Sequence, residues 1–182
     1  PDFQSLVRKS DPLSVKESVN AFNVPAGFHM EFVASSPDIG QPMNLAFDER
    51  GRLWVSSTLE YPYPVSLDQK GRDTIKVFED TTGDGRYDKI TTFADCLNIP
   101  TGIYPYKNGV IAWSIPNIWY FQDLDDDGRA DKRTKICGPL GYERDTHGMH
   151  SSFTMGYDGW LHLTHGFNNN TTVTAKDGSS IN

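Results

Sequence analysis

Residues 123–131 read Asp-Leu-Asp-Asp-Asp-Gly-Arg-Ala-Asp, so that acidic side chains fall on alternate residues before a glycine. A tight loop with this spacing can turn its carboxylates toward one hard cation, and calcium takes about six to eight oxygen ligands. We therefore predict a calcium site in this loop. Its predicted ligands are Asp123, Asp125, Asp127, Asp131 and the carbonyl oxygen of Arg129.

The loop does not match an EF-hand. An EF-hand needs a bidentate Glu at its twelfth position, which counted from Asp123 is Thr134. The residues before the loop, Ile118 to Phe121, are aromatic or β-branched and favour a strand. We therefore expect the loop to join two strands of a hairpin.

The acidic loop occurs twice in the chain. Residues 75–93 and 118–136 lie 43 residues apart and are identical at nine of nineteen positions. A strand-rich repeat of about forty to fifty residues is typical of β-propeller blades. The ligand positions of the first copy are Asp80, Thr82, Asp84 and Asp88. Because this copy has one carboxylate fewer, we predict that it binds calcium less tightly or not at all.

Simple glycine turns separate the acidic loops. Alternating apolar residues flank turns at Gly51, Gly109 and Gly159, which predicts a hairpin at each turn. One simple and one acidic hairpin would make a four-stranded blade. We therefore predict an all-β fold, a partial β-propeller of about two and a half blades over residues 25–182. A self-contained β-sandwich is the alternative; a propeller would need further blades outside this chain.

Residues 1–24 are predicted to form a lead-in segment. Residues 10–18 have the pattern of one short capped helix, and residues 28–34 alternate like a strand.

Composition excludes several classes of protein. The chain has 182 residues, 37% hydrophobic residues and a net charge of −7. This composition predicts a globular core and argues against nucleic-acid binding, which needs clustered Lys and Arg. The sequence contains no apolar run long enough for a transmembrane helix and no signal-peptide pattern.

Polar residues with acid–base chemistry gather near the C-terminal end. Asp145, His147 and His150 lie within six residues of one another, and His165 and Asn168 follow. An imidazole oriented by a carboxylate is the usual general base for oxidation of an alcohol. Hydrogen-bonded loop scaffolding is the competing interpretation, and a transition-metal site made by His147, His150 and His165 is a third.

Three stretches carry a family resemblance. They are QPMNLAFDERGRLWV at residues 41–55, the two acidic loops, and residues 147–162 with HGMH and MGYDGWLH. From Pro25 onward the chain resembles the glucose/sorbosone-dehydrogenase-like β-propellers, in the branch found in large exported bacterial proteins described as membrane-bound dehydrogenases. The resemblance implies calcium and pyrroloquinoline quinone (PQQ) as cofactors and a sugar or alcohol as substrate. It also implies remaining blades and a c-type haem domain elsewhere in a longer protein, and a periplasmic or extracellular location with membrane attachment through parts outside this chain.

The resemblance also implies roles for the polar cluster. A histidine ahead of the Gly156–Gly159 hairpin would remove the hydroxyl proton of the substrate, and this chain offers His150 or His147, of which we prefer His150. Asp145 would hold the imidazole in the required tautomer. We expect His165 and Asn168 to contact the cofactor. The alternative function is a calcium-stabilised, non-catalytic propeller that recognises carbohydrate or protein.

Overall fold

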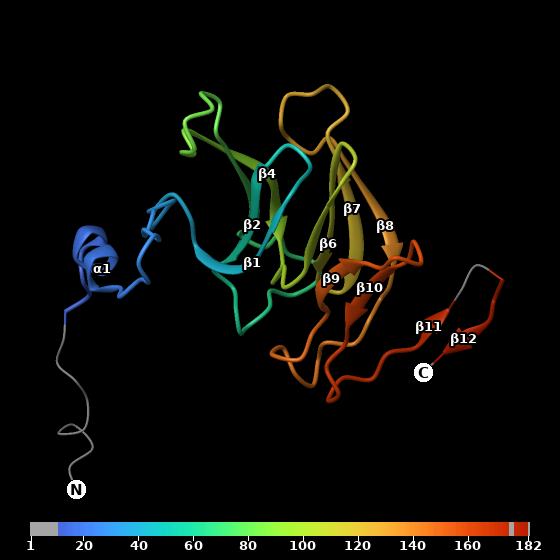
Figure 1. The fold of residues 1–182 in the computed structure, drawn as a ribbon. Coiled ribbons are helices and arrows are strands. Elements are labelled where there is room, and N and C mark those ends of the chain that lie inside the picture. The colour runs from blue at the N-terminus through green and yellow to red at the C-terminus, as the bar shows by residue number, and fades with distance from the viewer. Residues whose placement is uncertain (1–10, 175–176, 182) are drawn as a thin grey trace, which may run out of the picture. The chain divides into compact units, whose positions relative to one another are not determined.

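The computed structural model describes residues 11–174 and 177–181. Strands dominate this part of the chain, which confirms the all-β prediction, and they form two four-stranded antiparallel sheets and two smaller hairpins. The chain divides into two units, one up to Asp38 and one from Ile39 onward. The sheets and both acidic loops belong to the second unit (Figure 1).

The first sheet has its strands in chain order. They are β1 (Gln41–Phe47), β2 (Leu53–Thr58), β3 (Asp73–Glu79) and β4 (Lys89–Leu97). The turn between β1 and β2 is organised by Asp48, whose carboxylate accepts hydrogen bonds from the backbone N–H of Arg50 and Arg52 and from the indole N–H of Trp54. Gly51 adopts a φ of 76° there, a conformation that glycine takes without steric cost. The predicted Gly51 hairpin is therefore present.

The second sheet repeats this plan. Its strands are β5 (Ile103–Tyr106), β6 (Gly109–Ser114), β7 (Asn117–Gln122) and β8 (Lys132–Cys137). In both sheets a simple turn joins the first two strands, and an acidic loop joins the last two. Each four-stranded sheet thus contains one hairpin of each kind, as the sequence repeat predicts.

Two hairpins follow the second sheet. They are β9 (Ser151–Met155) with β10 (Leu161–Thr164), and β11 (Val173–Thr174) with β12 (Ser180–Ile181). The first of them is the hairpin predicted around Gly159. β9 lies against β5 of the second sheet, and Phe153 joins an apolar cluster with Trp113 and Ile118 of that sheet.

A shared apolar core joins the two four-stranded sheets. Trp54 and Phe93 of the first sheet pack in one cluster with Val110 and Phe121 of the second. The ring centroids of Trp54 and Phe93 are 4.7 Å apart in an edge-on arrangement. β2 and β6 are buried along their whole length, as expected of strands covered on both faces. Removal of this apolar surface from water is the main force that holds the two sheets together.

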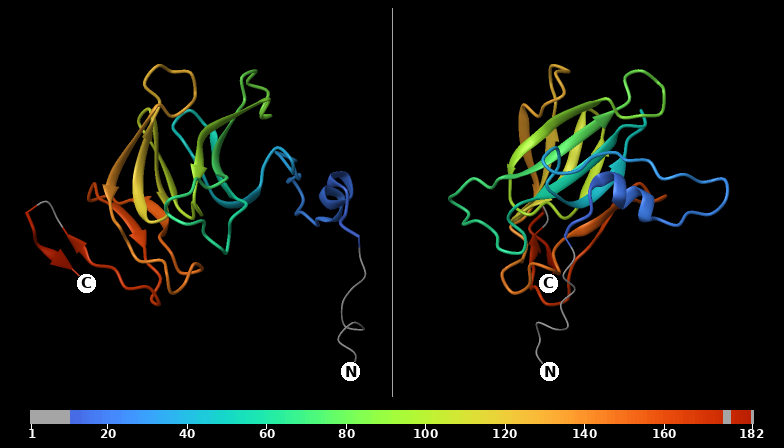
Figure 2. Two further views of the ribbon diagram at one scale, coloured as in Figure 1. Left: turned by 180° about the vertical axis from the view of Figure 1, so that it is seen from behind. Right: turned by 90° about the vertical axis from the view of Figure 1, so that its left-hand side faces the viewer.

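The loops of the second unit gather at two opposite ends of the sheets. Both acidic loops project from one end, and the loops after β2, β8 and β10 lie at the other (Figure 2). The predicted cation ligands and the predicted histidine site therefore occupy different ends of the molecule's β-sheet unit.

The N-terminal unit contains the helix α1 (Val15–Ala21). Ser14 caps it, and Glu17 completes a capping box with Ser14, so the predicted short capped helix is present but begins later than expected. The predicted strand at residues 28–34 is wrong, because the structure has no strand there. Alternation alone does not make a strand when no neighbouring strand pairs with its backbone groups. No helix among the described residues is long and apolar enough to cross a membrane.

Candidate functional site

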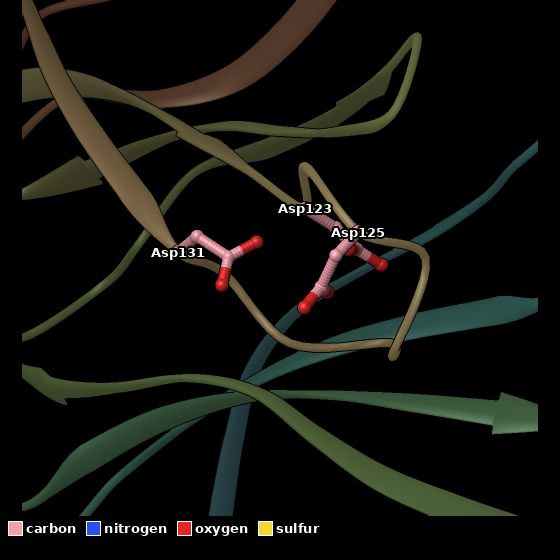
Figure 3. Close-up of side chains that lie close together, drawn as sticks. All are labelled: Asp123, Asp125 and Asp131. Carbon is pink, nitrogen blue, oxygen red and sulfur yellow. The ribbon is translucent and has the colours of Figure 1, made fainter.

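The second acidic loop brings three carboxylates together. Asp123, Asp125 and Asp131 each offer an oxygen atom, and these atoms lie within 4.8 Å of one another. Asp131, the residue immediately before β8, faces the other two across the loop (Figure 3). Asp127, also predicted as a ligand, lies outside this group, and its carboxylate accepts the backbone N–H of Arg129 at 2.8 Å.

The same carboxylates shape the loop that carries them. Asp123 accepts the backbone N–H groups of Asp126 at 2.8 Å and Gly128 at 2.9 Å, and Asp131 accepts that of Leu124 at 2.7 Å. Asp126 and Gly128 both have positive φ, 62° and 86°. These are conformations that Asp tolerates and Gly prefers. The acidic residues therefore shape the turn through their hydrogen bonds to its backbone.

The first acidic loop has the same hydrogen-bond pattern. Asp80 accepts the backbone N–H groups of Gly83 at 2.7 Å and Gly85 at 2.8 Å, and Asp88 accepts that of Thr81. The backbone hydrogen bond from Gly85, followed by the one from Gly83, lowers the pKa of Asp80. Thr82 occupies the position of Asp125, and its hydroxyl donates to Asp80. Among the described residues, Asp80, Asp84 and Asp88 do not form a group that could hold a metal.

The second acidic loop also connects the two sheets. The backbone N–H of Ala130 donates to the carbonyl oxygen of Phe93 in β4 at 2.8 Å, and Ala130 packs against the shared core. The conformation of this loop is therefore coupled to the contact between the sheets.

At the end of the sheets opposite to the acidic loops, His150 is a buried polar residue without a side-chain hydrogen bond among the described residues. Its side chain is 3% exposed, and neither ring nitrogen has a hydrogen-bond partner among the described residues. The ring lies between Trp113, at a centroid distance of 4.7 Å, and His165, at 4.5 Å. Burial, with a smaller contribution from His165, lowers the pKa of His150 to about 4. His150 is therefore a neutral imidazole at neutral pH.

The ring of His150 lines a cavity of about 710 Å³. Its other polar lining residues are His165, Asn169, Asn170, Thr171 and Thr172, and its apolar lining residues are Leu163, Val173 and Ile181. His165 is held by a 2.7 Å hydrogen bond between its Nε2 and the hydroxyl of Thr171. An unpaired polar group in a protein interior costs about 1–3 kcal/mol. A ligand that bonded to His150 would remove that cost.

His147 lies in a different environment. Its ring is exposed, and its Nδ1 is hydrogen-bonded to the hydroxyl of Tyr61, against which it packs edge-on. His147 lines a second cavity of about 470 Å³ with charged residues that include Arg144 and Asp145. The transition-metal site considered for His147, His150 and His165 does not form. Among the described residues, the side chains close enough together to hold a metal are Asp123, Asp125 and Asp131, and no histidine is among them.

Asp145 contacts neither candidate ring through a hydrogen bond among the described residues. Its carboxylate accepts the side-chain amide of Asn168 and the backbone N–H of His147, both at 2.9 Å, and these bonds lower the pKa of Asp145. We expected Asp145 to orient the imidazole of His150 or His147, but these hydrogen bonds go to Asn168 and to the backbone of His147 instead. Asn168, expected at a cofactor, fixes Asp145 instead and does not line the His150 cavity.

Asn169 is a residue whose role the sequence does not reveal. Its side chain is 6% exposed and makes four hydrogen bonds. The side-chain oxygen accepts the backbone N–H groups of Arg144 and Asp145, and the amide donates to the carbonyl oxygens of Asp145 and Gly148. Asn169 thus holds the loop that leads to His150. The run Asn168-Asn169-Asn170 is the only sequence signal for this role.

A second scaffold residue is Asp73 at the start of β3. Its buried carboxylate accepts hydrogen bonds from the hydroxyl of Thr58 and the backbone N–H groups of Leu59, Glu60 and Ile99. These bonds fix the loop that leads from β2 to the tyrosine in contact with His147.

Comparison with protein-family models gave one match. The model described as Domain of unknown function (DUF7133) matches residues 14–182. No curated protein and no solved structure matched the chain.

Proposed function

Because the chain belongs to the family described as Domain of unknown function (DUF7133), we propose a function from its own fold and site. The β-sheet unit forms blades of a β-propeller, and the cavity at His150 binds a hydroxyl-bearing sugar or alcohol. In this proposal the domain is the substrate-binding part of a sugar or alcohol dehydrogenase of the glucose/sorbosone-dehydrogenase-like kind.

The propeller proposal is supported by the repetition of the sheets. Two four-stranded antiparallel sheets with the same strand order follow each other in the chain, and apolar side chains from both form one core. β9 and β10 start a third unit, which gives about two and a half blades. A blade of a propeller packs its face on the next blade in this manner.

The state of His150 carries the functional proposal. A general base must be unprotonated and must have a free nitrogen within reach of the proton that it removes, and it works best with a pKa near the working pH. A pKa of about 4 therefore makes His150 a weaker base than an ordinary histidine. His150 is neutral, lines the cavity and has two ring nitrogens without a hydrogen-bond partner among the described residues. Both nitrogens are buried, so a ligand reaches either one only when the wall at His150 opens. A ligand hydroxyl could donate to one ring nitrogen, and the amide and hydroxyl groups of Asn170 and Thr171 could bind neighbouring hydroxyls.

Calcium fits the second acidic loop. Asp123, Asp125 and Asp131 supply the hard oxygen ligands that calcium prefers, and water and backbone carbonyl oxygens would complete the shell. Calcium there would offset the mutual repulsion of the three carboxylates and stabilise the loop. The loop lies at the end of the sheets opposite to the segment that joins β8 to β9 and ends at His150 (Figure 2), so we propose a structural role for calcium.

The described lining of the His150 cavity supplies no cationic partner for PQQ. The quinone is a polycarboxylate, and such a group needs cationic partners when it leaves water. Among the described residues, those that line the cavity include neither Lys nor Arg. A quinone bound against His150 is therefore not part of the proposed function.

That mismatch favours a second function. In it, the same cavity binds a hydroxyl-bearing ligand for recognition, and His150 serves as a hydrogen-bonding group instead of a base. Both functions require a ligand hydroxyl at His150, and they differ in whether the ligand is oxidised.

Substitution of His150 tests the shared requirement. Calorimetric titration of the 182-residue chain with glucose, glucitol and glycerol should show binding that His150→Ala weakens by about tenfold or more, because one ligand hydrogen bond is lost. The control is His162→Ala, because His162 is exposed on β10 and bonded to Asp158. Equal affinities of the chain and His150→Ala for every ligand would contradict the proposal.

Turnover separates the two functions. The full-length protein, supplied with an artificial electron acceptor, should oxidise the bound ligand if it is a dehydrogenase. In that case His150→Ala should lower turnover by about a hundred- to ten-thousand-fold, as loss of a general base does. Binding without turnover supports recognition.

A further inference from the structure

We infer that the cavity at His150 admits uncharged ligands and excludes carboxylated or phosphorylated ones, so that a polycarboxylate quinone does not bind against His150. This inference rests on the proposed function and narrows its ligand. It also departs from the cofactor position that the family resemblance implies, which places the base beside the quinone.

The chemistry of the cavity wall is the first reason. The described wall consists of histidine, asparagine, threonine and aliphatic side chains, with no acidic residue and no Lys or Arg. Charged residues of the same region, among them Glu143, Arg144 and Asp145, line the separate cavity at His147. The carboxylate of Asp145 is directed to Asn168 and to the backbone of His147. Among the described residues, the charged side chains of this region therefore line the cavity at His147 and not the one at His150.

The second reason is that His150 does not provide a positive charge at neutral pH. Its ring is enclosed by Trp113 and His165, and both its burial and the proximity of His165 disfavour a proton on it. With a pKa of about 4, only about one His150 ring in a thousand is protonated at pH 7. An anion that entered the cavity would lose its water without gaining a cationic partner from His150.

The groups that are present suit hydroxyls instead. A neutral imidazole has one donor and one acceptor nitrogen, and amide and hydroxyl side chains also offer both. A hydroxyl likewise donates and accepts, so it can satisfy either nitrogen of His150. A carboxylate only accepts, so it could pair with the donor nitrogen of His150 but never with the acceptor nitrogen.

Matched pairs of ligands test the inference. The 182-residue chain should be titrated calorimetrically with glucose and glucuronate, glucitol and gluconate, glycerol and glycerate, and PQQ alone. We expect the neutral member of each binding pair to bind about tenfold or more tightly than its carboxylate. PQQ should neither bind at His150 nor displace the neutral ligand.

A substitution that introduces a positive charge into the cavity wall gives a second test. Asn170 lines the cavity and is exposed, so Asn170→Lys should place a cation at the wall. We expect this variant to gain affinity for the carboxylates by about tenfold, whereas the matched neutral variant Asn170→Gln should not.

The outcomes separate the inference from the proposed function. Carboxylate or quinone binding that equals neutral-ligand binding and is lost in His150→Ala would overturn the inference and leave the hydroxyl site intact. Failure of every neutral ligand to bind, or binding that survives His150→Ala, would overturn the proposed function and this inference with it.

Discussion

The side-chain amide of Asn169 positions the loop before His150, although Asn169 has no role in the proposed chemistry. Its four hydrogen bonds reach backbone groups 21 to 25 residues earlier in the chain. They fix the loop that carries His147 and ends at His150. A buried amide with all its donors and acceptors paired is costly to replace, because its partners lose their bonds without regaining water.

Asn169→Ala should therefore lower the free energy of unfolding by about 2–3 kcal/mol. Urea-induced unfolding of the 182-residue chain measures this change. The matched control is Asn168→Ala, whose exposed amide bond to Asp145 should contribute less than about 1 kcal/mol. Equal losses in both variants would show that the buried bonds of Asn169 do not hold the loop.

Individual residue roles at this site were only partly predictable. The preference for His150 over His147 rested on its place before a strand, and the structure distinguishes the two rings by burial and by the contact of His147 with Tyr61. Asp145 is close to both histidines in sequence, but its oxygens are directed elsewhere. Partners such as Trp113 lie far from His150 in sequence and come close only because β9 packs against β5 of the second sheet.

At the scale of elements, the conformation of the acidic loops follows from their local sequence. Spacing of Asp and Gly determines which backbone N–H groups a carboxylate can reach, so loops with the same spacing adopt the same hydrogen-bond pattern. Hairpins at Gly51, Gly109 and Gly159 were predictable for the same local reason. The alternation at residues 28–34 was not sufficient, because a strand also needs a partner strand, which a local pattern does not specify.

Because the two loops share their backbone pattern, Thr82→Asp should convert the first loop into a calcium site. The new carboxylate would occupy the position of Asp125, and affinity at the first loop should rise by about tenfold or more. Calorimetric titration with calcium measures this as an added binding event. Thr82→Asn is the matched control, since it supplies an oxygen without the charge. An unchanged titration of Thr82→Asp would mean that the first loop is a plain turn.

For the molecule as a whole, the connection of the second acidic loop to β4 links cation binding to the contact between the sheets. Ala130 donates to Phe93 and packs on the shared core. A cation that bound only the folded loop would therefore stabilise the sheet pair by mass action.

Calcium at about a hundred times its Kd should raise the Tm of the 182-residue chain by about 5–10 °C. Differential scanning calorimetry with and without calcium measures the shift. Asp125→Ala should abolish the shift, whereas Asp126→Asn, which changes a loop residue outside the carboxylate group, should retain it. A shift that persists in Asp125→Ala would place calcium elsewhere.

The proposed function depends most on the fold keeping His150 as a neutral, buried imidazole whose ring nitrogens have no hydrogen-bond partner among the described residues. Because burial disfavours the charged form, the folded protein lowers the pKa of His150 from 6.5 to about 4, and the ring should stay neutral as the pH falls through 6.5. The most direct measurement is an NMR titration of the ring nitrogens of His150, assigned with His150→Gln. We predict a midpoint near pH 4 and, above it, one protonated and one unprotonated nitrogen; a midpoint at or above 6.5 would show that His150 is solvated or paired with a carboxylate and would contradict the account.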